Sequence, residues 1–60
     1  MFKLREYRIK NDYTQRYIAY KMGVSQQTVV KWEKGQVLPS VSHLIKLSSL
    51  IGCSIEELIA

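Results

Sequence analysis

The side chains best suited to chemistry lie between residues 14 and 35, and they are amides and hydroxyls rather than nucleophiles. This segment predicts two short helices joined by a turn at Gly23, with Ser25, Gln26 and Gln27 leading the second helix. Such a helix can present the polar side chains of its first turn to base edges in the major groove of DNA. The sequence therefore predicts a helix-turn-helix unit that reads double-stranded DNA.

Enzymatic chemistry is not expected from this chain. It offers no nucleophile beside a base, no carboxylate pair suited to one cleft and no glycine-rich loop to hold a phosphate. The single Cys53 cannot form an internal disulfide, and the single His43 lies too far from it for zinc spacing. We expect no catalysis, cofactor, metal or small-molecule substrate, with His43 an exposed imidazole and Cys53 a small buried apolar side chain.

Charge divides the chain into two unequal parts. The 60 residues carry nine Lys or Arg and five Asp or Glu, for a net charge of +4. Residues 1–36 hold eight of the basic side chains and only three acidic ones, whereas the remainder is slightly acidic. This division predicts one half that faces a polyanion and one half for packing or partners. No signal peptide or membrane-spanning run is visible, so a cytoplasmic location is expected.

Five helices and no strand are expected, in one domain over residues 1–60. Leu4, Tyr7 and Ile9 predict the apolar face of a first helix, which Asn11 and Asp12 can end because both tolerate left-handed backbone. Each later helix begins at a hydroxyl residue that can cap its free amides, namely Thr14, Ser25, Ser40 and Ser54. The glycines expected to end helices are Gly23, Gly35 and Gly52.

The third helix, over about residues 25–34, has two distinct sides. Val29 and Trp32 are spaced to face inward, so Trp32 is predicted to be core rather than a platform for a base. Ala19 on the preceding helix is small enough to allow two helices to cross closely. Ser54 and Glu57 match the capping-box pattern at the start of the fifth helix.

Together these motifs resemble the Xre/Cro-type helix-turn-helix domain of the lambda-like phage repressors, over essentially the whole chain. The matching pieces, in order, are Leu4–Arg8, Tyr13–Gln15, Ile18–Ala19, Met22–Ser25, Thr28–Val29, Trp32–Gly35, Pro39–Ser40, Leu44–Leu47 and Ile51–Leu58. The resemblance implies an all-α fold of five helices with the helix-turn-helix at the second and third. Tyr17 departs from the pattern, because a glutamate is common at this position.

The resemblance also implies roles for individual side chains. The base-reading positions are Ser25, Gln26, Gln27 and Lys31, and because a glutamine amide can pair with N7 and N6 of adenine, adenine is expected in each half-site. By the same resemblance Gln15 meets a phosphate at the start of the second helix, and we also expect phosphate contacts from Arg16, Thr28, Lys34 and the backbone amides of Gly35 and Gln36. Arg8 and Glu33 are expected to form a structural pair between the first helix and the end of the third.

The leading interpretation is a sequence-specific transcriptional regulator, a repressor, that binds a two-fold symmetric operator as a homodimer. The second half of the chain has more apolar side chains than its helical faces need, and the candidates for the dimer contact are Val37, Leu38, Ile45, Leu50 and Ile59. The alternative is an antitoxin-like or adaptor module whose fourth and fifth helices hold another protein. Steep salt dependence of binding favours the first, and weak salt dependence favours the second.

Overall fold

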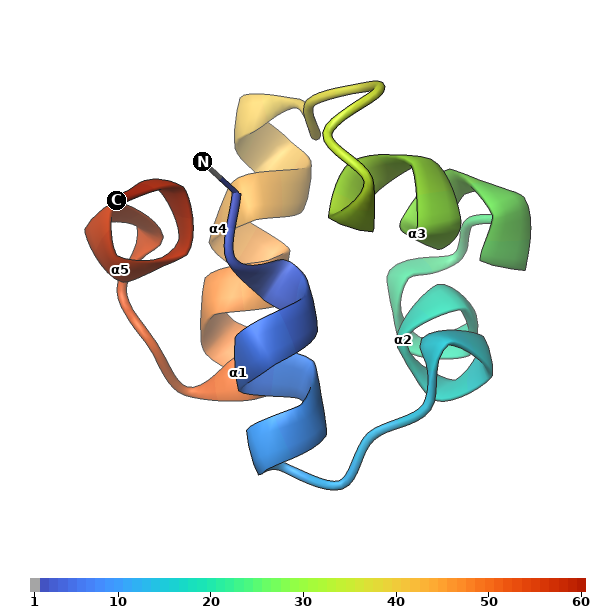
Figure 1. Cartoon of the computed structure of the whole chain (residues 1–60), viewed down its shortest axis with the longest axis horizontal. Helices are drawn as coiled ribbons and strands as arrows, with labels where there is room; N and C mark the ends of the chain where they lie inside the picture. The colour runs from blue at the N-terminus through green and yellow to red at the C-terminus, as the bar shows by residue number, and fades with distance from the viewer. Residues whose placement is uncertain (1) are drawn as a thin grey trace.

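The computed structural model describes residues 2–60, and this part of the chain contains five α-helices. They are α1 (Leu4–Lys10), α2 (Gln15–Met22), α3 (Gln26–Glu33), α4 (Val41–Ile51) and α5 (Ile55–Ile59). Figure 1 shows α2 and α3 on one side of the molecule and α5 on the opposite side, with α1 and α4 between them in this view. The predicted all-α fold is confirmed; the predicted domain also includes Met1, which lies outside the described residues.

Hydroxyl side chains start the four later helices, as the sequence predicts. The side chains of Thr14, Ser25, Ser40 and Ser54 each accept a hydrogen bond from the backbone amide three residues further on. Ser54 and Glu57 form the complete capping box, because the Ser54 amide also donates to Glu57 Oε1 at 2.8 Å. Each cap satisfies an amide that would otherwise lack a partner within its helix.

Left-handed backbone residues end the first two helices. Asp12, which follows the C-cap Asn11 of α1, has a φ of 58°, a conformation in which aspartate costs less than most residues. Gly23 ends α2 with a φ of 70°, and its lack of a side chain allows the tight turn into α3. This turn brings α3 back across α2, and the two helices pack together.

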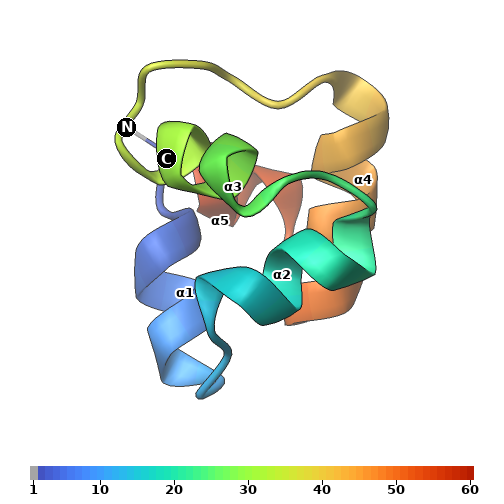
Figure 2. The same cartoon turned by 90° about the vertical axis from the view of Figure 1, so that its right-hand side faces the viewer.

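The core takes at least one fully enclosed side chain from every helix. These are Leu4 from α1, Ile18 from α2, Val29 and Trp32 from α3, Leu47 from α4 and Leu58 from α5. The inward position of Trp32 confirms its predicted role in the core. The segment before α1 also contacts α5, because the Lys3 amide donates to the Leu58 carbonyl at 2.6 Å. Figures 1 and 2 show these two segments side by side.

Three expectations for single side chains differ from the structure. Ile9 is 50% exposed on the outer side of α1 and takes no part in the core. His43 is half-buried rather than exposed, because its ring lies 5.3 Å from the Trp32 ring and its Nδ1 lies 3.1 Å from Ser40 Oγ. Cys53 is half-buried at the edge of the core, where burial raises the pKa of its thiol.

Within residues 2–60, no helix has both the length and the apolar character that crossing a membrane requires.

Candidate DNA-binding site

The outward face of α3 carries the predicted base-reading side chains. Val29 and Trp32 are buried, whereas Gln26, Gln27 and Lys31 are exposed. An α-helix turns about 100° per residue. At this rate Gln26, Gln27 and Lys31 fall on the side of α3 that faces away from the buried Val29 and Trp32. The structure therefore brings the two glutamine amides and the Lys31 ammonium group onto one open surface.

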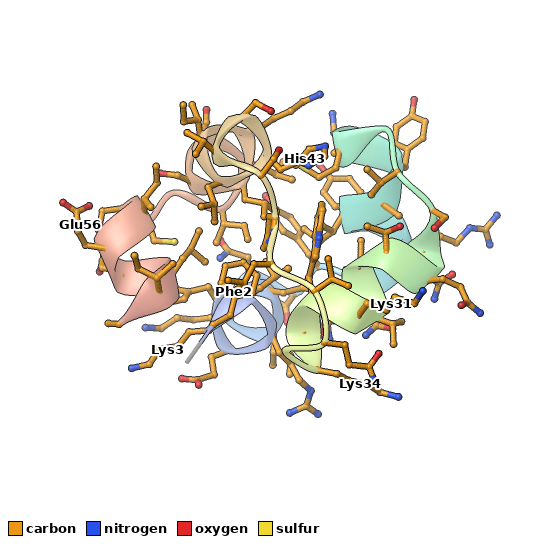
Figure 3. The ribbon with its side chains drawn as sticks, turned by 90° about the horizontal axis from the view of Figure 1, so that it is seen from above. Phe2, Lys3, Lys31, Lys34, His43 and Glu56 are labelled. Atoms are coloured by element: carbon orange, nitrogen blue, oxygen red, sulfur yellow. The ribbon has the colours of Figure 1, made fainter. Side chains whose placement is uncertain are left out.

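A shallow hollow of about 400 Å³ lies on this outward face of α3. The hollow is lined by Gln26, Gln27, Val30, Lys31, Lys34 and Gln36. Lys31 and Lys34 lie over α3, well away from Glu56 on α5 (Figure 3). The site thus offers amide donors and acceptors for base edges beside two cations suited to phosphate or guanine. Val30 was missing from the predicted site, although counting turns along the helix places it on this face.

The hydroxyls of Ser25 and Thr28 are engaged with each other at the start of α3. Ser25 Oγ accepts from the Thr28 amide at 3.2 Å and lies 2.9 Å from Thr28 Oγ1. Any contact of either hydroxyl with DNA has to be shared with this cap. Gln26 and Gln27, the first two residues of the helix, supply no side-chain group to this cap.

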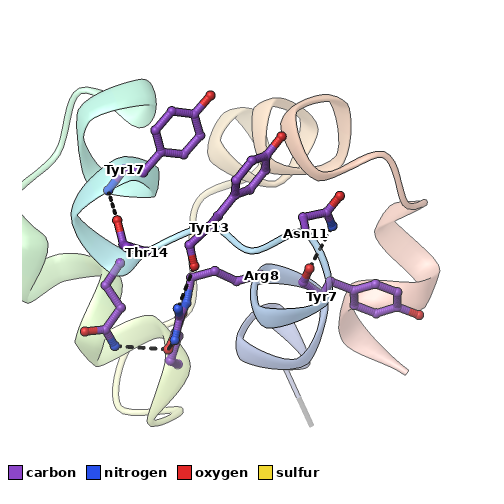
Figure 4. A network of polar contacts seen from close by, with 8 residues as sticks. Tyr7, Arg8, Asn11, Tyr13, Thr14 and Tyr17 are labelled. Carbon is purple, nitrogen blue, oxygen red and sulfur yellow. Dashed lines mark hydrogen bonds and ion pairs between the residues drawn. The ribbon is translucent and has the colours of Figure 1, made fainter.

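A partly buried ion pair holds the end of α3 to the first two helices. Arg8 Nε donates to Glu33 Oε2 at 2.6 Å, and the side chains of Arg8 and Glu33 are 12% and 3% exposed. Arg8 also donates from Nη1 to the Tyr13 carbonyl at 2.8 Å (Figure 4). The Arg8–Glu33 pair expected from the resemblance is thus present, and it also fixes the connection between α1 and α2.

Gln15, a predicted phosphate ligand at the start of α2, shares this network. Its side-chain Nε2 donates to Glu33 Oε1 at 3.0 Å. Because the carboxylate can only accept, the amide nitrogen rather than the amide oxygen faces Glu33, and its second N–H is left for another acceptor. A phosphate at the α2 N-terminus is an acceptor of the right kind. Arg16, the next residue, is exposed.

The backbone amides of Gly35 and Gln36 are already used inside the chain. The Gly35 amide donates to the Trp32 carbonyl at 3.1 Å, and the Gln36 amide donates to the Lys31 carbonyl at 3.0 Å. With Gly35 at a φ of 74°, this is the hydrogen-bond pattern of a Schellman helix stop. Both amides were expected to bind phosphate, but the structure assigns them to ending α3, while the neighbouring Lys34 side chain remains exposed.

A glycine turn between two capped helices, the second with a polar outward face beside lysines, defines a helix-turn-helix domain. This chain belongs to the helix-turn-helix family, of the lambda-repressor-like type, since the family's model matches residues 4–58.

Individual relatives agree with this assignment. The chain is similar to an uncharacterised HTH-type transcriptional regulator of Methanocaldococcus jannaschii, with 39% identity over 56 residues that cover 93% of this chain and 85% of the relative. It is 33% identical over 58 residues to the cryptic phage CTXphi transcriptional repressor RstR of Vibrio cholerae, covering 97% of this chain and 52% of RstR. The N-terminal DNA-binding domain of SinR from Bacillus subtilis has a TM-score of 0.84 at 25% identity, over 97% of this chain and 86% of that chain.

Proposed function

We propose that this chain is a sequence-specific regulator of transcription, a repressor, that inserts α3 into the major groove of double-stranded DNA. The observation that carries the proposal is the outward face of α3, where Gln26 and Gln27 lead the helix and Lys31 and Lys34 follow. Amides in this position can read base edges, while the lysines attract the backbone. We also propose that the protein acts in the cytoplasm and has no catalytic activity.

The contacts divide into a reading set and a holding set. Gln26, Gln27 and Lys31 approach base edges, with Ser25 at the margin of the same surface. The phosphate-holding set consists of Gln15, Arg16, Thr28 and Lys34. Gln15 and Arg16 open α2, whereas Thr28 and Lys34 lie near the two ends of α3, so the holding set flanks the reading set. This arrangement fixes the helix in the groove without adding sequence information.

We also propose that the chain acts as a homodimer on a two-fold symmetric operator. An apolar hollow of about 420 Å³, lined by Phe2, Leu38, Pro39, Leu44 and Ile59, lies next to a second hollow that shares Phe2 and Leu38 with it. Leu38 itself is 73% exposed. A projecting side chain beside an apolar hollow is what a self-complementary two-fold contact needs, because each copy can fill the hollow of the other.

The five dimer candidates from the sequence differ in their suitability. Leu38 and Ile59 line the apolar hollow, and Val37 is exposed beside Leu38 in the chain. Ile45 is exposed on α4, and Leu50 is half-buried against the core. We therefore place the dimer contact at Leu38 and Ile59 rather than along α4.

A second candidate function is the protein-interaction module, with DNA binding secondary. It is favoured by the exposure of Val41 and Ile45, which are 71% and 58% exposed one turn apart on α4. An apolar contact of this kind depends weakly on salt, whereas reading of DNA depends on it steeply.

The test of the proposed function is selection of bound sequences from a random duplex library at about physiological salt. A two-fold symmetric site with adenines in each half is expected. The double variant Gln26→Ala with Gln27→Ala should lose about 1–3 kcal/mol for each bidentate base contact removed. Ser49→Ala, an exposed polar change on α4, is the control and should bind as the wild type does. Retention of DNA without any enriched sequence would overturn the proposal and favour the protein-interaction module.

A further inference from the structure

We infer that Val30 reads the methyl group of a thymine in each half-site, which makes it a specificity-determining residue beside the two glutamines. This inference rests on the proposed reading of DNA by α3. Val30 is half-buried, but it does not belong to the core cluster, which takes Val29 and Trp32 from this helix.

The position of Val30 along α3 places it on the reading surface. It follows Gln26 by four residues and Gln27 by three, and it precedes Lys34 by four. Residues three and four apart lie on the same strip of a helix, so Val30 sits between these three side chains. It is also the one apolar residue among those that line the hollow on the outward face.

The shape of this surface suits a methyl group. The other side chains around the hollow, Gln26, Gln27, Lys31, Lys34 and Gln36, are all longer than valine, and Val30 is the half-buried apolar side chain among them. The valine side chain cannot form hydrogen bonds with the donors or acceptors of a base edge. Thymine C5-methyl is the apolar group that base pairs present in the major groove, and cytosine carries only hydrogen at this position. Val30 therefore favours thymine over cytosine.

The spacing also limits where this thymine lies. Four residues along a helix correspond to about 6 Å, and successive base pairs are about 3.4 Å apart. The thymine read by Val30 should therefore lie one or two base pairs from an adenine read by Gln26.

The test replaces each thymine of the selected site in turn with deoxyuridine, which removes the methyl group and keeps every hydrogen-bonding group. One position in each half-site should lose about fourfold in affinity, as expected for the burial of one methyl-sized group. Val30→Ala, which removes both terminal methyl groups of the side chain, should reduce the preference for thymine over uracil at that position. Val30→Thr, which keeps the volume of the side chain and one of the two methyl groups, should retain more of the preference than Val30→Ala.

The matched control is Val41→Ala, which shortens an exposed valine on α4 outside this hollow and should retain the full preference for thymine. The inference is wrong if no thymine is sensitive to loss of its methyl group, or if the sensitivity is undiminished in Val30→Ala. In either case a selected site that still depends on Gln26 and Gln27 leaves the proposed function intact. Failure to select any sequence would instead overturn both.

Discussion

At the scale of single residues, the Glu33 carboxylate joins segments that are distant in the chain. It accepts hydrogen bonds from Gln15 and Arg8, which lie 18 and 25 positions before it. With the Glu33 side chain only 3% exposed, these bonds are shielded from water in the folded chain. Loss of Glu33 would leave the Arg8 guanidinium, 12% exposed, with a charge that no partner balances.

Glu33→Ala should therefore lower the free energy of unfolding by about 3 kcal/mol, measured by urea denaturation. A chain of this size has a total stability of roughly 3–9 kcal/mol, so this variant will be close to unfolding. Glu33→Gln should cost less, because its amide oxygen can still accept from Arg8. Glu6→Ala, which removes an exposed acid from α1, is the control and should change stability by less than about 0.5 kcal/mol. An equal effect of Glu33→Ala and Glu6→Ala would show that the network does not hold the fold.

Val30 and Gly35 show where residue-level prediction from the sequence succeeds and fails. The exposure of Gln26, Gln27 and Lys31 could be predicted, because helical periodicity alone separates them from Val29 and Trp32. Val30 was missed because its apolar character suggests the core. Gly35 ends α3 as predicted, whereas the hydrogen bond of its amide to the Trp32 carbonyl depends on how the backbone closes the helix, which residue types alone do not specify.

At the scale of elements, the charge of Glu57 is part of the start of α5. The hydrogen bond from the Ser54 amide holds the pKa of the Glu57 carboxyl below its ordinary value of 4.5, and the Lys10 charge acts in the same direction. Folding thus favours the ionised carboxylate. The resulting stabilisation is fully present above about pH 4.5 and is lost as the pH falls through the lower pKa of the folded state.

Acidification should consequently loosen α5 before it unfolds the rest of the domain. The Glu57 carboxyl should titrate below its ordinary pKa in an NMR experiment, and the Ser54 amide resonance should shift with it. Glu57→Gln should show a smaller loss of stability between pH 5 and pH 3 than the wild type. Glu56→Gln should retain the pH dependence of the wild type, because Glu56 takes no part in the capping box. A Glu57 carboxyl that titrates at or above 4.5 would contradict the role of its charge.

Helix starts could be predicted from the sequence because their chemistry is local. Thr14, Ser25, Ser40 and Ser54 each cap an amide three residues away, so each signal lies within a single turn. The environment of His43 could not be predicted in this way, because it depends on α4 packing against Trp32 of another helix. The bond between Lys3 and Leu58 is equally remote, since it joins the two ends of the chain.

At the scale of the whole molecule, one domain is too small to bind a two-fold site alone. The Cα atoms extend over 24 × 23 × 19 Å, whereas half-sites one helical turn apart are separated by about 34 Å. Two copies are therefore needed for simultaneous contact with both half-sites. The second hollow, which shares Leu38 with the apolar hollow, is lined by Gly35 at the end of α3, so pairing there would also set the distance between the α3 helices of the two copies.

The salt dependence of DNA binding reports how many copies occupy the site. Each phosphate that a copy neutralises releases counterions, so two copies give about twice the dependence of one. With about four phosphates per copy, the logarithm of the binding constant should fall with the logarithm of salt concentration at a slope near −7 for a dimer and near −4 for one copy. Leu38→Asp places a charge in the apolar contact and should reduce the slope on the full site toward the lower magnitude, while binding of one half-site persists.

Val41→Asp is the matched control, because it adds the same charge at an apolar side chain that is 71% exposed, outside the hollow lined by Leu38. It should keep the slope of the wild type if pairing occurs at Leu38. If Leu38→Asp instead binds the full site with a slope near −7, the proposed contact at Leu38 is wrong. A reduced slope for Val41→Asp alone would place the contact on α4, where Ile45 is also exposed.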